Sequence, residues 1–203
     1  MALLAKDEGG KGFDPVEAGV HKAICIAVYD LGTQYNEIFN KSARQVLLMW
    51  ELPDQRIQIE DRDLPRAISK KYTLSLHEKA NLRQDLEGWR GKAFTEKELA
   101  GFDVIKLLGV NCQIQVIHKK TERKTYANIK AILPLPKDQW KEPENPLRSF
   151  SFEDDETFPE GMQEWVIKII EESDEYQRKG ADYEHYDEED GPPPDRFDDD
   201  IPF

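Results

Sequence analysis

The chain has 203 residues, of which 38% are hydrophobic and 34% are charged, and its formal net charge is −13. This length fits one domain with an appendage, and no apolar run reaches the ~18 residues that a membrane-spanning helix needs. The two cysteines, Cys25 and Cys112, exclude a disulfide scaffold and a Cys-based zinc site. The N-terminal residues do not resemble a signal peptide, so we expect a cytoplasmic protein with both thiols buried.

Five segments of the first 140 residues show the two-residue apolar period of β-strands. Residues 19–31 are apolar on both faces, which is typical of a central strand. Residues 44–52 form the second expected strand, which the turn signal Pro53-Asp54 should end, and residues 66–76 form the third. Residues 111–120 and 125–133 flank a polar turn and predict a hairpin.

Helical signals lie between the third and fourth expected strands. Residues 78–89 place Leu82, Leu86 and Trp89 on one stripe, and Thr95 with Glu98 forms a capping box that predicts a second, short helix. The resulting order is that of an OB-fold, a mainly β, five-stranded Greek-key barrel with a helix between strands 3 and 4. Periodicity alone leaves an unrelated small barrel or an α+β sheet open, and a fold does not prove a function.

A proline-containing linker, residues 136–146, follows the last expected strand, and Phe150 and Phe152 should pack back on the body. Pro159 is expected to open an extra C-terminal helix at its first turn. The amphipathic stripe of this helix comprises Met162, Trp165, Val166, Ile169 and Ile170. Such a helix either covers its own barrel or contacts a partner.

Charge divides the chain into a basic body and an acidic tail. Residues 1–140 carry 22 basic and 19 acidic side chains, net +3, whereas residues 141–203 carry 6 and 22, net −16. The charge repulsion and the scarcity of aliphatic residues predict that the tail is disordered. We therefore expect a flexible N-terminus (1–15), an OB-like domain (16–140), a linker with the amphipathic helix (141–179) and the acidic tail (180–203).

The tail ends in the sequence Phe-Asp-Asp-Asp-Ile-Pro-Phe. A terminal phenylalanine can fill an apolar pocket while its carboxylate meets a basic side chain, and the aspartates can be attracted to basic rims. We interpret this end as a protein-binding tip made of Asp198, Asp199, Asp200, Ile201, Pro202 and Phe203.

The sequence FDDDIPF is identical to the acidic tip of typical bacterial single-stranded DNA-binding proteins. The body departs from the bacterial pattern, since it is longer, lacks a Gly/Gln-rich linker and carries an extra helix. It resembles bacteriophage-encoded single-stranded DNA-binding proteins in the blocks LLGVNCQIQVIHKK and TYANIKAILPLP and in the PEGMQEW helix that follows them, over most of residues 16–176.

The resemblance implies a phage or prophage protein in the cytoplasm of a bacterial host. Such a protein coats single-stranded DNA during replication, recombination or repair, without sequence preference, and uses its tip to recruit host replication and repair proteins. A homo-oligomer is compatible with this picture, and no membrane partner is expected.

A single-strand site on an OB-fold needs aromatic platforms for bases and basic side chains for phosphates. Residues of both kinds are interleaved at or near the expected strand ends and loops. The candidates are Tyr29, Tyr35, Phe39, Lys41, Arg44, Trp50, Arg62, Arg66, Lys70, Lys71, Tyr72, His118, Lys119, Lys120, Arg123, Lys124 and Tyr126.

Several candidates have a structural alternative. Tyr29 and Trp50 could fill the core. Lys70 and Lys71 point to opposite faces of one strand, so one groove can use at most one of them. His118 lies on the same face of its strand as core positions. A solvated turn is the alternative for the strongest phosphate candidates, which are Lys119, Lys120, Arg123 and Lys124.

Catalysis has little support in the sequence. The four histidines show no metal-ligand spacing and no Gly-rich phosphate loop is present, so we expect a non-enzymatic protein with no cofactor and no metal. A nuclease-like metal site is a minor alternative, at Glu51, Glu60, Asp61 and Asp63. The rival function is an adaptor or decoy that captures host tip-binding proteins without coating DNA, and a smaller possibility is a recombination mediator that anneals strands.

Overall fold

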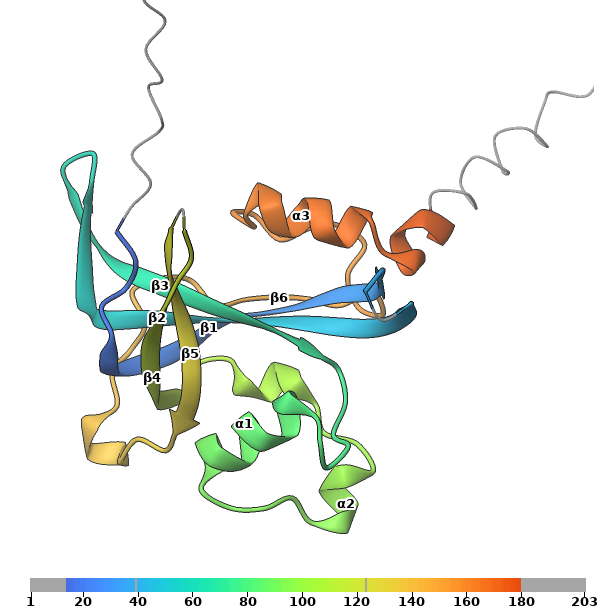
Figure 1. The fold of residues 1–203 in the computed structure, drawn as a ribbon, viewed down its shortest axis with the longest axis horizontal. Coiled ribbons are helices and arrows are strands. Elements are labelled where there is room, and N and C mark those ends of the chain that lie inside the picture. The colour runs from blue at the N-terminus through green and yellow to red at the C-terminus, as the bar shows by residue number, and fades with distance from the viewer. Residues whose placement is uncertain (1–13, 39, 123, 180–203) are drawn as a thin grey trace, which may run out of the picture.

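The computed structural model describes residues 14–38, 40–122 and 124–179, which form one curled sheet with helices on both faces (Figure 1). The predicted tail and its tip lie outside the described residues. The strands are β1 (Gly19–Asn36), β2 (Lys41–Ile59), β3 (Arg62–Thr73), β4 (Asn111–Lys120), β5 (Thr125–Leu133) and the short β6 (Arg148–Phe150). The helices are α1 (Asn81–Arg90), α2 (Glu96–Leu99) and α3 (Glu164–Glu171), with 3-10 turns at Val104–Leu107 and Lys137–Gln139.

The five long strands form an antiparallel half-barrel in the order β3-β2-β1-β4-β5, and β6 joins β1 in parallel. Strand β1 connects the two halves, because residues 19–24 pair with β4 while residues 24–36 pair with β2. Two register shifts in the β1–β2 ladder, after Cys25 and after Asp30, mark irregularities of the kind that bend a strand and let a sheet curl.

The bounds predicted for the fourth and fifth strands are confirmed, and the first three strands are longer or displaced. The prediction that Pro53-Asp54 ends the second strand is wrong. Strand β2 continues to Ile59 because a register shift between Leu52 and Arg56 places the proline outside the regular ladder. Glu60 and Asp61 then make a tight turn with positive φ values of 47° and 62°, as a two-residue hairpin requires.

The inner face of the half-barrel holds the larger core and is covered by α1. Leu82, Leu86 and Trp89 are buried there, as the stripe predicted, although the helix begins at Asn81 and not at Glu78. A Cβ on Gly88 would lie 2.7 Å from the carbonyl oxygen of Ile132, so a glycine is needed for this close approach of α1 to β5. The predicted capping box of Thr95 and Glu98 is present at the start of α2.

The outer face of β1 and β2 holds a second core, which α3 covers together with Phe150 (Figure 1). Val166 and Ile170 pack there, so the amphipathic helix covers its own sheet. Two predictions about this helix are wrong. Trp165 is 45% exposed, and the helix starts at Glu164 because the residues after Pro159 form a separate turn.

The segment after α3 is attached to the end of β1. A carboxylate oxygen of Glu175 accepts hydrogen bonds from the Thr33 backbone N–H at 2.5 Å, and the other accepts from the Thr33 hydroxyl at 2.7 Å. Gly32 has a φ of 68°, and a Cβ there would lie 2.6 Å from the Ser173 side chain. These contacts hold α3 against the sheet at its C-terminal end.

We predict that Glu175→Gln destabilises the protein at neutral pH by about 0.5–1 kcal/mol, because the ionised carboxylate is the better acceptor. Burial opposes ionisation, but the hydrogen bonds from Thr33 outweigh it and hold the pKa of Glu175 below its usual value. A depressed pKa means that this contribution is complete above the ordinary glutamate pKa of ~4.3 and is lost as pH falls through the folded value.

Urea unfolding at pH 7, 5 and 3 measures this effect. The variant and the natural chain should converge at the lowest pH, and Glu172→Gln, at an exposed neighbouring position, serves as the control. A constant difference at all three pH values would show that the charge of Glu175 does not matter.

Candidate nucleic-acid interface

The half-barrel has an open seam between β3 and β5, which are not paired with each other among the described residues. A cleft of about 590 Å³ occupies this seam. One wall comes from the β2–β3 hairpin and the other from the start of β5. The lining residues include Ile57, Ile59, Pro65, Arg66, Lys124 and Tyr126.

Residues 14–16 lie in the seam and connect its two sides. The guanidinium of Arg66 on β3 donates to the Asp14 carbonyl oxygen, and the His118 Nε2 atom on β4 lies 2.8 Å from the Val16 carbonyl oxygen. Val16 itself is buried in the inner core. Arg66 and His118, both predicted to contact DNA, are therefore close to the seam, where they hold this segment in place.

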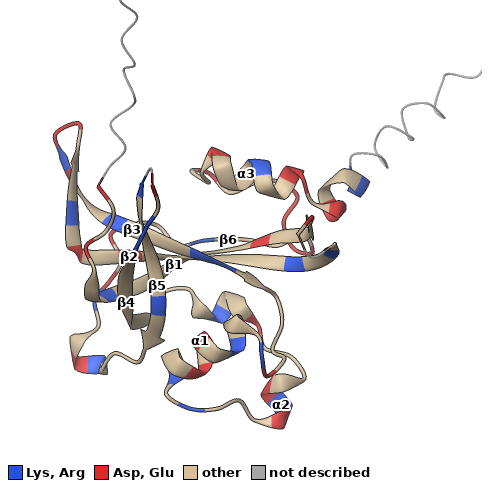
Figure 2. Cartoon of the chain, viewed as in Figure 1, with Lys and Arg blue, Asp and Glu red and all other residues tan. Residues whose placement is uncertain are grey.

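The β4–β5 hairpin carries the densest group of available cations. Lys119, Lys120 and Lys124 are exposed, and none of them has an ion-pair partner within residues 14–179 as described. Figure 2 shows basic colouring along this hairpin. Arg123, the fourth predicted base, lies outside the described residues.

Tyr126 is 50% exposed and lies opposite Lys119 across the β4–β5 ladder. Its ring also lines the seam, which places an aromatic surface and unpaired ammonium groups at one site. This is the combination that single-stranded nucleic acid requires. The hairpin is thus the part of the predicted site that the structure brings together.

The β1–β2 turn is a second, smaller group. Tyr35 is 59% exposed and its hydroxyl donates to the Asn40 side-chain oxygen at 2.6 Å. Lys41 is exposed beside it, while Phe39 lies outside the described residues. The turn carries an exposed ring and a cation, but it does not line the seam.

Arg62 and Lys71 are exposed cations on β3 that make no ion pair to any residue the structure describes. Lys71 lies opposite Leu47 on the outer face, and Lys70 lies on the inner face, as the strand period predicted. Of these two lysines, Lys71 is the one available to a ligand on the outer surface.

Three predicted aromatic contacts are wrong because the rings are buried. Trp50 has no exposed surface and packs against Trp89, with ring centroids 5.8 Å apart. Tyr29 is buried in the outer core, and Tyr72 is buried in the inner core. None of these rings can stack on a base without unfolding of the core around it.

Two predicted phosphate contacts involve cations that already have an anionic partner in the structure. Arg44 pairs with Asp30 at 2.5 Å and with Glu153 at 3.6 Å. Lys70 pairs with Asp85 of α1 at 2.5 Å. Binding of a phosphate at either position would first break an internal ion pair.

Two of the carboxylates considered for a metal site already bind other residues of the chain. Glu51 is fully buried and accepts hydrogen bonds from the backbone N–H groups of Glu144 and Asn145 at 3.0 and 2.8 Å. Asp63 pairs with Arg56 at 2.9 Å. Within the described part of the chain, no cluster of three or more His, Cys, Asp or Glu residues could hold a metal ion.

The two cysteines are buried, as predicted. Burial raises the pKa of the Cys25 thiol to about 12, and a backbone hydrogen bond with Ala27 lowers it by a smaller amount. Thiols of this kind are poor nucleophiles at neutral pH.

Sequence reasoning missed the seam residues Asp14, Pro15, Val16, Ile57 and Ile59. The alternation of Ile57 and Ile59 was a detectable strand signal after Pro53. No local pattern links residues 14–16 to a strand 50 residues further on, because that contact depends on how the sheet curls.

No known protein-family profile matches the chain, and a search of curated proteins finds no similar sequence. Among the described helices, none is both long and apolar enough to cross a membrane.

The contacts of the Tyr72–Asp85–Lys70 group predict that the buried Tyr72 contributes more to stability than the exposed Tyr126. The Tyr72 hydroxyl donates to the same Asp85 oxygen as Lys70, at 2.7 Å, and burial together with this carboxylate raises the pKa of Tyr72 far above its usual value. We expect Tyr72→Phe to lower the unfolding free energy by about 1.5–3 kcal/mol, the usual range for a hydrogen bond to a charged group.

Chemical denaturation measures this loss. The matched substitution Tyr126→Phe, at an exposed position, should change stability by less than about 0.5 kcal/mol. Equal effects of the two substitutions would contradict the assignment of Tyr72 to the core.

Proposed function

We propose that this chain is a non-enzymatic protein that binds single-stranded DNA without sequence preference. The observation that carries the proposal is the group of exposed, unpaired lysines beside Tyr126 on the β4–β5 hairpin, next to the open seam. Such cations can neutralise phosphates without losing an internal partner, and the ring can stack on any base.

The arrangement of the strands supports an OB-fold as the scaffold for this site. In OB-folds, oligonucleotides bind across the face of strands 2 and 3 and against the loops after strands 1 and 4. The corresponding positions of this chain hold Lys71 on β3, Tyr35 and Lys41 at the β1–β2 turn, and the basic β4–β5 hairpin. The three groups together would form one basic and aromatic path.

The distribution of charge favours the same path. Cations of the body lie on its hairpins and on the α1–α2 side, whereas residues 141–179, which include α3, hold 5 basic and 12 acidic side chains. Figure 2 shows acidic colouring around α3 and the segment after it. DNA would therefore be attracted to the basic hairpins and repelled from the acidic segment of residues 141–179.

The motif FDDDIPF supports a second part of the proposal, the recruitment of host replication and repair proteins. Its aspartates, Ile201 and Phe203 suit a pocket with an apolar floor and a basic rim. Together with the phage-like sequence blocks of the body, this motif favours a phage-encoded protein that acts in a bacterial cytoplasm.

Replacement of Lys119, Lys120 and Lys124 by Ser should weaken binding to oligo-dT. Each lost phosphate contact reduces the slope of log K against log salt by ~0.7, so three contacts change the slope by about 2 and the affinity at 0.1 M salt by about 100-fold. Fluorescence anisotropy over a salt series measures both quantities, with a duplex of equal length for comparison.

The control replaces Lys79, Lys92 and Lys97, which are exposed on the α1–α2 side, by Ser. An equal loss in the control would show that only net charge matters. Absence of binding by the natural chain at low salt would overturn the proposal and favour the adaptor or decoy function.

Deletion of Phe203 should abolish capture of host proteins while DNA binding stays equal or becomes tighter, since the acidic tail competes with DNA for basic surface. Quantitative comparison of proteins retained from a bacterial lysate by the natural and shortened chains tests the first claim. Retention of the same proteins by both chains would exclude the tip as the recruiting element.

A further inference from the structure

The outer face of β4, β5 and the start of β1 is a sheet surface whose side chains belong to neither core. Gln115 points outward there, because its neighbours Ile114 and Val116 are buried on the inner face. Its partners across the ladders, Val20 and Ala131, lie on the same face. We call this surface the β1–β4–β5 face, and its members are Val20, Lys22, Gln113, Gln115, Ile117, Lys119, Tyr126, Asn128, Lys130, Ala131 and Leu133.

The β1–β4–β5 face combines exposed apolar side chains with unused amides. Its four large apolar side chains are between 41% and 56% exposed, and they are Val20, Ile117, Tyr126 and Leu133. The amides of Gln115 and Asn128 make no hydrogen bond with any residue that the structure describes. Exposed apolar groups gathered on one surface are typical of a binding site, and the amides add free donors and acceptors to it.

The charge on this face has one sign. Lys119 and Lys130 are exposed and have no ion-pair partner among the described residues. Lys22, at the far end of the face, is half-buried and lies near Asp54, which is already paired with Lys141 at 2.5 Å. None of the members is acidic. The face therefore favours an anionic ligand.

The same lysines disfavour a second copy of the chain as the occupant. Two such faces packed together would bring the ammonium groups of both copies close to each other without a carboxylate between them, and like charges at an interface are unfavourable. A single strand of DNA suits all three kinds of side chain, because it offers phosphates to the lysines, base edges to the amides and a stacking surface to Tyr126.

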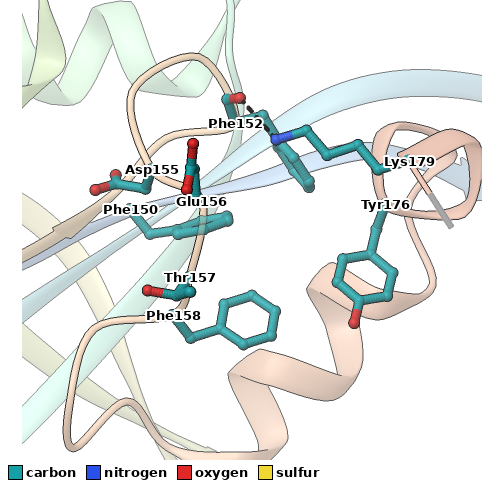
Figure 3. A pocket seen from close by; sticks show the side chains of 8 residues that line it. All are labelled: Phe150, Phe152, Asp155, Glu156, Thr157, Phe158, Tyr176 and Lys179. Carbon is teal, nitrogen blue, oxygen red and sulfur yellow. Dashed lines mark hydrogen bonds between the residues drawn. The ribbon is translucent and has the colours of Figure 1, made fainter. Parts of the chain in front are cut away.

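The α3 side of the molecule lacks this charge pattern. A pocket of about 380 Å³ there is lined by four aromatic rings, but Lys179 lines it together with Asp155 and Glu156 (Figure 3). Cation and anions lie side by side in this pocket, so it provides no continuous basic surface for phosphates.

We propose that single-stranded DNA continues from the β4–β5 hairpin onto the β1–β4–β5 face, where Lys130 and Lys22 bind phosphates beyond those held by the hairpin lysines. This inference rests on the proposed function and extends its site. Strand β4 covers about 20 Å from Lys119 to Gln113 at ~3.3 Å per residue. This length has room for at most about six further nucleotides at the ~3.4 Å spacing of a stacked strand.

Protection of an introduced thiol tests whether DNA covers this face. The natural cysteines are buried, so Asn128→Cys in the full chain supplies the reactive thiol. A saturating oligo-dT of about 15 nucleotides, near the upper site size of one OB-fold, should slow its modification by a maleimide at least fivefold. The control, Lys168→Cys on the exposed side of α3, should be slowed less than twofold. If the strand binds and both thiols react as fast as without DNA, the inference is overturned and the DNA-binding proposal stands.

A charge-matched pair of variants tests the phosphate contacts. Lys22→Ser combined with Lys130→Ser should weaken binding of the long oligo-dT by about 20-fold at 0.1 M salt, as expected for two lost contacts. An oligo-dT of about 5 nucleotides, which the hairpin alone can hold, should lose less than twofold. Lys168→Ser combined with Lys179→Ser removes the same charge from the α3 side and is the control. Equal losses in the two double variants would overturn the inference.

Two further results distinguish other occupants. If the natural chain sediments as a dimer that Ile117→Ser converts to a monomer, the face joins two copies and the inference is overturned. Protection of Asn128→Cys by polyglutamate as strong as that by DNA would assign the face to acidic protein segments and would also overturn it. Absence of strand binding by the natural chain at low salt would remove both this inference and the proposed function.

Discussion

Strand β1 is buried on both faces over residues 23–32, and this double burial determines where the other elements lie. A strand in this situation needs an apolar cover on each side. Helix α1 and the inner strands supply one cover, and α3 with Phe150 supplies the other. Because β1 also pairs with β2, β4 and β6, a change in its register would shift its ladders to all three of these strands.

The same constraint leaves the seam open. The bends of β1 direct β2 and β3 to one side and β4 and β5 to the other, and the described strands β3 and β5 remain unpaired edges. Natural proteins protect such edges with charged side chains, bulges or covering segments. Here residues 14–16 and the charged hairpins serve that purpose, so the features that prevent edge pairing also create a basic cleft.

The cations of the body fall into two groups, those that have a carboxylate partner within the fold and those that have none among the described residues. Arg44, Lys70 and Arg56 each have a carboxylate partner and connect elements of the fold. The lysines of the β4–β5 hairpin have none among the described residues. The acidic α3 side differs from this hairpin, because a pocket there is lined by the rings of Phe150, Phe152, Phe158 and Tyr176. The described part of the molecule therefore has unpaired cations on one hairpin and a predominantly acidic segment at residues 141–179.

The sequence by itself determined the strand and helix types, the limits of β4 and β5, the stripe of α1, the capping box of α2 and the division of charge. These are local properties, since side-chain period, capping and turn chemistry act over a few residues. The extension of β2 past Pro53 escaped prediction because its ladder to β3 resumes only after a bulge.

Only the tertiary structure decided which candidates are available to a ligand. The two-residue period of a strand did not distinguish Trp50 and Tyr72 from Tyr126, because burial depends on which face of the sheet α1 covers. Arg44 and Lys119 also look alike in the sequence, but Asp30 reaches one and no described acid reaches the other. Burial and ion pairing are contacts between residues far apart in the chain, so they emerge when the sheet curls and the helices close its two faces.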